Sequence, residues 1–88
     1  MELVYKTTNI YEQMFLLECG VEHINKVETV VNYKGETFYR MYFVKDKAFY
    51  EAKKVINECR EQRVRIPIKD FISAKKMRWA IIDNLIKG

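Results

Sequence analysis

The sequence predicts an α+β fold in which a small, mainly antiparallel sheet with a central β-hairpin packs with about three helices. Apolar and polar residues alternate on both sides of a turn at residues 32–35, and two apolar stripes of helical spacing follow that hairpin. The 88 residues include only three Gly and one Pro, and no linker-like composition shift divides them. We therefore expect residues 1–88 to form a single domain.

The chain begins with a β-prone stretch at residues 3–6, and a helix is expected to start after Asn9. Asn9 is a good N-cap, and Glu12, three residues on, is its expected reciprocal partner. Gly20 supplies the residue that commonly ends such a helix. The apolar residues of this helix recur at helical spacing: Ile10, Met14 and Leu17.

Residues 21–32 and 36–44 read as the two strands of the hairpin. Asn32 at the first turn position and Gly35 at the fourth are typical of a type I turn closed by a glycine bulge. This turn pairs odd positions with odd positions. The face predicted to be core holds Val27, Thr29, Val31, Tyr39, Met41 and Phe43. The other face holds Lys26, Glu28, Val30, Phe38, Arg40 and Tyr42, and is either a binding platform or covered by the last helix.

Asp46 is the expected cap of a second helix with one buried stripe, made of Ala48, Phe49, Ala52, Val55, Ile56 and Cys59. The alternation in residues 63–68 then predicts a short, half-buried strand, which Pro67 confines to an edge or a connection. Asp70 can cap a third helix that extends to Ile86. Its predicted apolar face contains Phe71, Ala74, Met77, Ile81, Ile82 and Leu85, and Ile72, Trp79 and Ile86 widen it enough for two contact surfaces.

Enzymatic and metal-binding roles find little support in the residue types. His23 is the single histidine and has no nucleophile motif near it. Cys19 and Cys59 do not match a compact zinc-ligand spacing and look like reduced intracellular thiols. No apolar stretch approaches the roughly 20 residues needed to cross a bilayer. We expect a cytoplasmic protein that is not an enzyme, with no metal, no cofactor and no evident small-molecule substrate.

Basic residues gather in the C-terminal third of the chain. Residues 60–78 carry seven basic and two acidic side chains, a local balance of +5 in a chain whose net charge is +4. Such a segment can neutralise phosphates. The candidate nucleic-acid contacts here are Arg63, Arg65, Lys69, Lys75, Lys76 and Arg78. Phe38, Arg40 and Tyr42 on the hairpin can add base stacking and one more phosphate contact.

The stretch Tyr5-Lys6-Thr7-Thr8-Asn9-Ile10-Tyr11, the glycine at position 20 and the late Phe71, Ala74, Met77, Ile81 pattern resemble a family of small domains. That family is common in phages and mobile elements of Gram-positive bacteria. The resemblance extends over nearly the whole chain and implies an intracellular accessory protein. It implies no catalytic residues.

Two functional hypotheses follow from these observations. The first is a non-enzymatic nucleic-acid-binding accessory protein that uses the basic C-terminal segment. The alternative is a protein-interaction module, either a homodimeric adaptor or an inhibitor of a host or phage protein, because the third helix and the hairpin both present apolar residues beyond those of one core.

Overall fold

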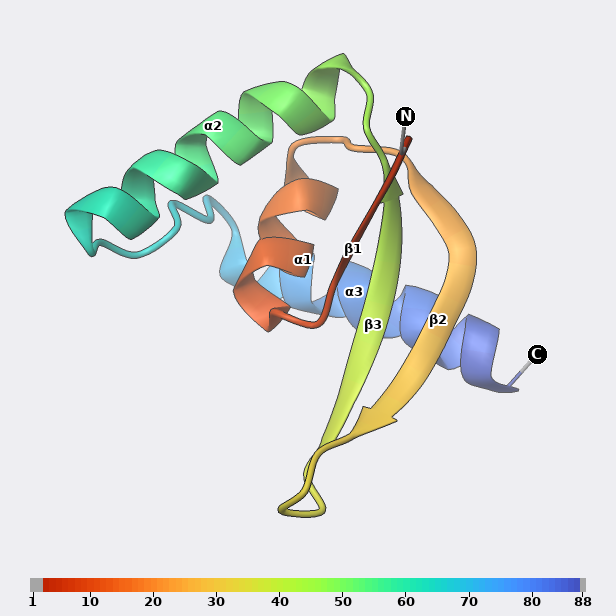
Figure 1. Ribbon diagram of the computed structural model, residues 1–88. Helices are drawn as coiled ribbons and strands as arrows, with labels where there is room; N and C mark the ends of the chain where they lie inside the picture. The colour runs from red at the N-terminus through yellow and green to blue at the C-terminus, as the bar shows by residue number, and fades with distance from the viewer. Residues whose placement is uncertain (1–2, 88) are drawn as a thin grey trace.

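The computed structural model describes residues 3–87 and has the predicted α+β architecture (Figure 1). The elements are, in chain order, β1 (Val4–Thr7), α1 (Ile10–Glu18), β2 (His23–Val31), β3 (Thr37–Val44), α2 (Lys47–Gln62) and α3 (Phe71–Lys87). The three strands form one antiparallel sheet in the order β1-β3-β2. The hairpin strand β3 is therefore the central strand.

The hairpin has the predicted turn and register. Gly35 has φ +80°, and its amide donates to the carbonyl of Asn32 at 3.0 Å. Glu28 lies opposite Arg40, and their charged atoms are 3.7 Å apart. The side-chain assignment to the two faces is confirmed wherever the strands are paired in this register, from Val27 to Val31.

The predicted core face of the hairpin is buried only where helices cover it. Met41 and Phe43 are fully buried, and Val27 is partly buried. Val31 is 61% exposed and Thr29 is also exposed, so the expectation that they belong to the core is wrong. Figure 1 gives the reason, because the tip of the hairpin extends beyond the helical layer.

Helix α1 is surrounded by other elements. Every residue from Glu12 to Leu17 is buried, which includes two polar side chains. Asn9 caps the helix as predicted, accepting a hydrogen bond from the Glu12 amide at 3.0 Å. The reciprocal bond from the Asn9 amide goes to the Thr7 hydroxyl instead, because the Glu12 carboxylate is turned into the protein.

The core joins α1, the sheet and α2. Its main buried residues are Phe15, Leu16, Leu17, Val21, Met41, Phe43, Phe49, Ala52 and Ile56. Asp46 caps α2 by accepting a hydrogen bond from the Phe49 amide at 2.8 Å. The confirmed stripe of α2 thus gives this helix a fixed position against α1 and β1.

The predicted short strand at residues 63–68 does not form. Arg63 ends α2 with φ 55°, and an irregular connection then leads to α3. Ile66 and Ile68 are nevertheless half-buried against the core. The carboxylate of Glu18 accepts hydrogen bonds from the amides of Lys69 and Asp70, so side-chain bonding replaces a strand ladder here.

Helix α3 begins after Asp70, whose carboxylate accepts a hydrogen bond from the Ser73 amide at 3.0 Å. Its buried residues are Ala74, Arg78 and Ile82, with Ile81 and Leu85 partly buried. Phe71 and Met77 are 48% and 41% exposed, so their predicted place in the buried stripe is wrong. The buried stripe is rotated toward Arg78, because Gln13 of α1 binds that side chain.

Candidate nucleic-acid interface

The structure divides the predicted basic contacts into two sets. Arg63, Arg65 and Lys69 lie on the connection between α2 and α3 and are exposed. Lys75 and Lys76 are exposed on the first half of α3. These five cations lie on consecutive parts of one segment and remain available to a ligand.

Arg78 does not belong to that exposed set. It is 4% exposed, and its Nε donates to the Oε1 of Gln13 at 2.6 Å. Burial lowers the pKa of this guanidinium. The expectation that Arg78 stands on the open basic surface is wrong, because it takes a core position one turn from Ala74 and from Ile82. Their spacing of four residues is the sequence signal that identifies this position.

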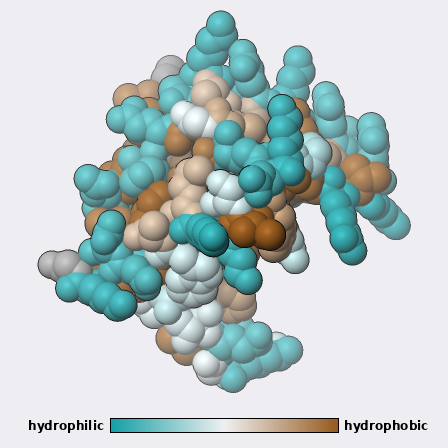
Figure 2. Space-filling view, turned by 180° about the vertical axis from the view of Figure 1, so that it is seen from behind, coloured by the Kyte–Doolittle hydropathy of each residue, from teal (hydrophilic) through white to brown (hydrophobic). Residues whose placement is uncertain are grey.

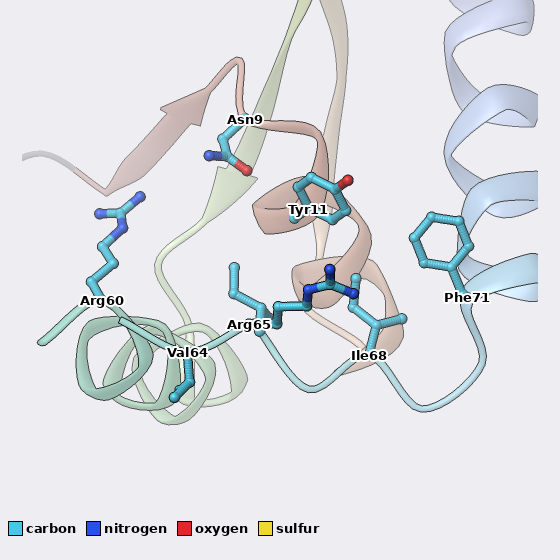
Figure 3. A pocket seen from close by; sticks show the side chains of 8 residues that line it. Asn9, Tyr11, Arg60, Val64, Arg65, Ile68 and Phe71 are labelled. Carbon is cyan, nitrogen blue, oxygen red and sulfur yellow. The ribbon is translucent and has the colours of Figure 1, made fainter. Parts of the chain in front are cut away.

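A pocket is formed where the connection between α2 and α3 passes α1. Its volume is about 660 Å³. We call it the Tyr11–Phe71 pocket, and its lining residues are Asn9, Tyr11, Arg60, Val64, Arg65, Ile66, Ile68 and Phe71. Figure 3 shows that they come from the start of α1, the end of α2, the connection and the start of α3. The fold thus brings four separate segments to one concavity.

Two aromatic rings form one wall of this pocket. The centroids of Tyr11 and Phe71 are 6.4 Å apart, and the rings are inclined by 44°. They are 57% and 48% exposed. Arg65 extends from the connection toward the side on which these rings lie (Figure 3). The pocket therefore combines exposed π faces with a guanidinium that has no recorded ion pair among residues 3–87.

An exposed stripe on α3 continues from the pocket. Phe71, Lys75 and Trp79 are four residues apart, so they lie on adjacent turns of one helix face. Trp79 is 41% exposed and packs edge-on against Tyr39, with centroids 5.9 Å apart. Figure 2, which views the molecule from behind, shows hydrophilic side chains interspersed with smaller apolar patches. Aromatic and basic side chains alternate along this stripe.

The outer face of the hairpin is a separate surface. We use this name for the face with Phe38, Arg40 and Tyr42, all of which are partly exposed. Lys26 lies 4.7 Å from the centre of the Tyr42 ring. Helix α3 packs on the opposite face through Trp79 and Tyr39, but Phe38 also lines a small pocket with Trp79. Of this hairpin face, the fold therefore brings Phe38 beside Arg78 and Trp79 of α3.

A charged cluster around the buried Glu12 reaches the Tyr11–Phe71 pocket through Arg60. The buried carboxylate of Glu12 accepts hydrogen bonds from the Tyr5 hydroxyl and from Arg60, and Lys53 lies 3.8 Å away. Burial and the neighbouring Glu12 raise the pKa of Tyr5 to about 12. Sequence reasoning missed this cluster, because its members come from β1, α1 and α2. It fixes Arg60 at the pocket edge.

The remaining candidate chemistry is sparse. Within residues 3–87, no group of three or more His, Cys, Asp or Glu side chains is arranged to hold a metal ion. Cys59 is buried, and Cys19 is exposed with a pKa raised by partial burial and by Glu18. His23 lies at an irregularity in the β2–β3 pairing.

None of the helices in the described range is long and apolar enough to cross a membrane.

Comparison of the chain with protein-family models, with curated proteins and with solved structures finds no match.

Proposed function

We propose that this protein binds single-stranded nucleic acid along the Tyr11–Phe71 pocket and the exposed stripe of α3. The observation that supports this function best is the alternation of aromatic and cationic side chains along one continuous surface. Tyr11, Phe71 and Arg65 meet at the pocket, and Lys75 and Trp79 follow on α3.

The chemistry of a single strand suits this order. Unpaired bases stack on exposed aromatic rings, and each stacked base contributes roughly 1–3 kcal/mol without requiring a particular sequence. The phosphates that link the bases can form ion pairs with Arg65 and Lys75. On α3, side chains four residues apart are separated by about 6 Å along the helix axis, so Lys75 stands between two aromatic positions. Arg63 and Lys69 extend the same positive surface on the connection.

A duplex is a poorer ligand for this site. Bases in a duplex are stacked on one another and cannot enter the pocket, whereas a single strand can turn them outward. The proposal therefore includes a preference for single strands over duplexes of the same sequence.

Fluorescence anisotropy with a labelled oligodeoxythymidylate of about a dozen nucleotides tests this function. We expect binding that weakens as salt increases. Phe71→Ala should weaken it by about 1–3 kcal/mol through lost stacking. Lys75→Ala should reduce the slope of log affinity against log salt by about 0.7, the value for one phosphate contact on a single strand.

Lys47→Ala and Lys54→Ala are matched controls, because both lysines are exposed on α2 and neither lines the pocket. They should leave affinity nearly unchanged. Absence of binding at low salt, or equal losses in the control variants, would contradict the proposal.

The wider role that we propose is that of a non-enzymatic cytoplasmic accessory protein of a phage or mobile element. The resemblance of the strand, cap and first helix to small domains of such elements supports this context. The basic, aromatic surface supports a nucleic-acid role within it.

A protein-interaction role is the second candidate, and one observation favours it. Ile72, Trp79 and Ile86 are exposed at intervals of seven residues on α3, which is the spacing of a helix-packing seam. A homodimer through this seam would sediment as a dimer at high concentration, and Ile86→Lys would convert it to a monomer. A protein that stays monomeric at high concentration would exclude the homodimer.

A further inference from the structure

A second, smaller pocket contains Arg78 and Trp79. Its volume is about 110 Å³. We call it the Trp79 pocket, and it is lined by Ile10, Thr37, Phe38, Tyr39, Arg78 and Trp79. It is thus formed between the start of α1, the hairpin strand β3 and the middle of α3.

The cation in this pocket is Arg78. Arg78 is buried, yet no carboxylate of residues 3–87 forms an ion pair with it. Its one hydrogen bond in this range is from Nε to the neutral amide oxygen of Gln13. A buried charge is costly unless it is paired, and an arginine offers five N–H donors in a planar fork. Within residues 3–87 the two terminal nitrogens form no hydrogen bond, so they remain available to a ligand.

The surroundings of Arg78 favour an oxyanion. The carbon of its guanidinium lies 5.2 Å from the centre of the Trp79 ring, and that ring packs on Tyr39. Aromatic walls exclude water and strengthen electrostatic contacts inside the pocket. At roughly 30 Å³ for each water molecule, the volume accommodates a group of a few heavy atoms. A phosphate group fits this limit, whereas a whole nucleotide does not.

We propose that the Trp79 pocket binds one phosphate group of the nucleic-acid strand through the terminal nitrogens of Arg78. The identity of the anion rests on the proposed function, whereas an anion site as such rests on the pocket alone. The attached base remains outside and contacts the exposed part of Trp79. The pocket thereby fixes the strand at a second point, beyond the Tyr11–Phe71 pocket.

Trp79 is the single tryptophan of the chain, so its emission reports on this site directly. Inorganic phosphate and deoxythymidine 5′-monophosphate, titrated at constant ionic strength, should change that emission saturably. Sodium chloride should not, and thymidine, which lacks the phosphate, should require a much higher concentration than its monophosphate. Arg78→Met should weaken phosphate binding about tenfold or more, because it removes charge-assisted hydrogen bonds. Lys54→Met is the matched control, since Lys54 is exposed on α2 and lines neither pocket.

A second measurement does not depend on a variant. The Arg78 Nε–H resonance of the wild-type protein should shift as phosphate is added, and an unchanged resonance would overturn the inference even if Arg78→Met failed to fold. Acetate that binds as tightly as phosphate would overturn the assignment to phosphate. Oligonucleotide binding with no phosphate effect at Trp79 would overturn this inference alone. A phosphate effect without oligonucleotide binding would overturn the proposed function and leave the anion site in place.

Discussion

Glu12 and Gln13 are neighbours in α1 and are both fully buried, yet they hold their cationic partners in different ways. Glu12 is an anion that binds two cations and a hydroxyl, so its cluster contains charges of both signs. Gln13 is neutral. Its amide nitrogen donates to the carbonyls of Thr7 and Tyr39, and its oxygen accepts from Arg78.

The difference separates a structural cluster from a binding one. The Glu12 cluster satisfies its own charge and joins β1, α1 and α2. The Gln13 cluster positions Arg78 without neutralising it, so the guanidinium can still accept an anion. The same helix turn therefore joins three elements through Glu12 and holds Arg78 of the proposed anion site through Gln13.

Glu12→Gln should have the largest effect on stability. The change removes the anion that binds Arg60 and Lys53, and hydrogen bonds to a charged group contribute about 1.5–3 kcal/mol each. We expect a loss of about 2–3 kcal/mol in the free energy of unfolding, measured by urea denaturation. Glu51→Gln, at an exposed position of α2, is the control and should stay within about 0.5 kcal/mol of wild type. Equal stability of the two variants would show that the Glu12 cluster is not structural.

The alkaline limit of stability should depend on Tyr5. Its pKa is raised from 10.0 to about 12 in the folded protein, so folding favours the neutral phenol. The stabilisation is complete below pH 10 and is lost as the pH rises from 10 to about 12. Tyr5→Phe should lower the free energy of unfolding by about 1 kcal/mol near neutral pH. Between these two pH values, the free energy of unfolding of the variant should fall less steeply with pH than that of the wild type. Parallel stability curves for the two proteins, measured by denaturation across this range, would contradict the raised pKa.

Arg78→Met should have the smallest effect on stability. Methionine keeps the apolar stem and removes a buried charge that has no anionic partner among residues 3–87. The gain offsets the lost hydrogen bond to Gln13, so we expect a change within about 1 kcal/mol by urea denaturation. If Arg78→Met lost more free energy of unfolding than Glu12→Gln, Arg78 would be a structural residue and the contrast between the two clusters would be wrong.

Local patterns were sufficient for much of the fold. The turn residues Asn32 and Gly35 set the register of the hairpin, and Asn9, Asp46 and Asp70 each cap the helix that follows. These features depend on atoms within a few residues of one another. They hold regardless of what the element later packs against.

The candidate site was predicted only in part. Arg65, Lys75 and their neighbours were recognisable by their charge, and they remain exposed. Tyr11 and Phe71 were read as parts of helices with apolar faces, because nothing local indicates that the two rings meet at the mouth of a pocket. The basic segment and the outer face of the hairpin are two separate candidates in the sequence, and only the position of α3 brings Phe38 beside Arg78 and Trp79.

The sequence by itself determined the helices, their caps, the hairpin register and the concentration of positive charge in residues 60–78. Only the tertiary structure decided that Arg78 is buried, that Phe71 is exposed and that residues 63–70 form no strand. The physical reason is that periodicity defines which side chains share a face, whereas burial and pairing depend on the element that covers that face. In this protein, Arg78 is buried where it donates a hydrogen bond to Gln13 of α1, a residue 65 positions away in the chain.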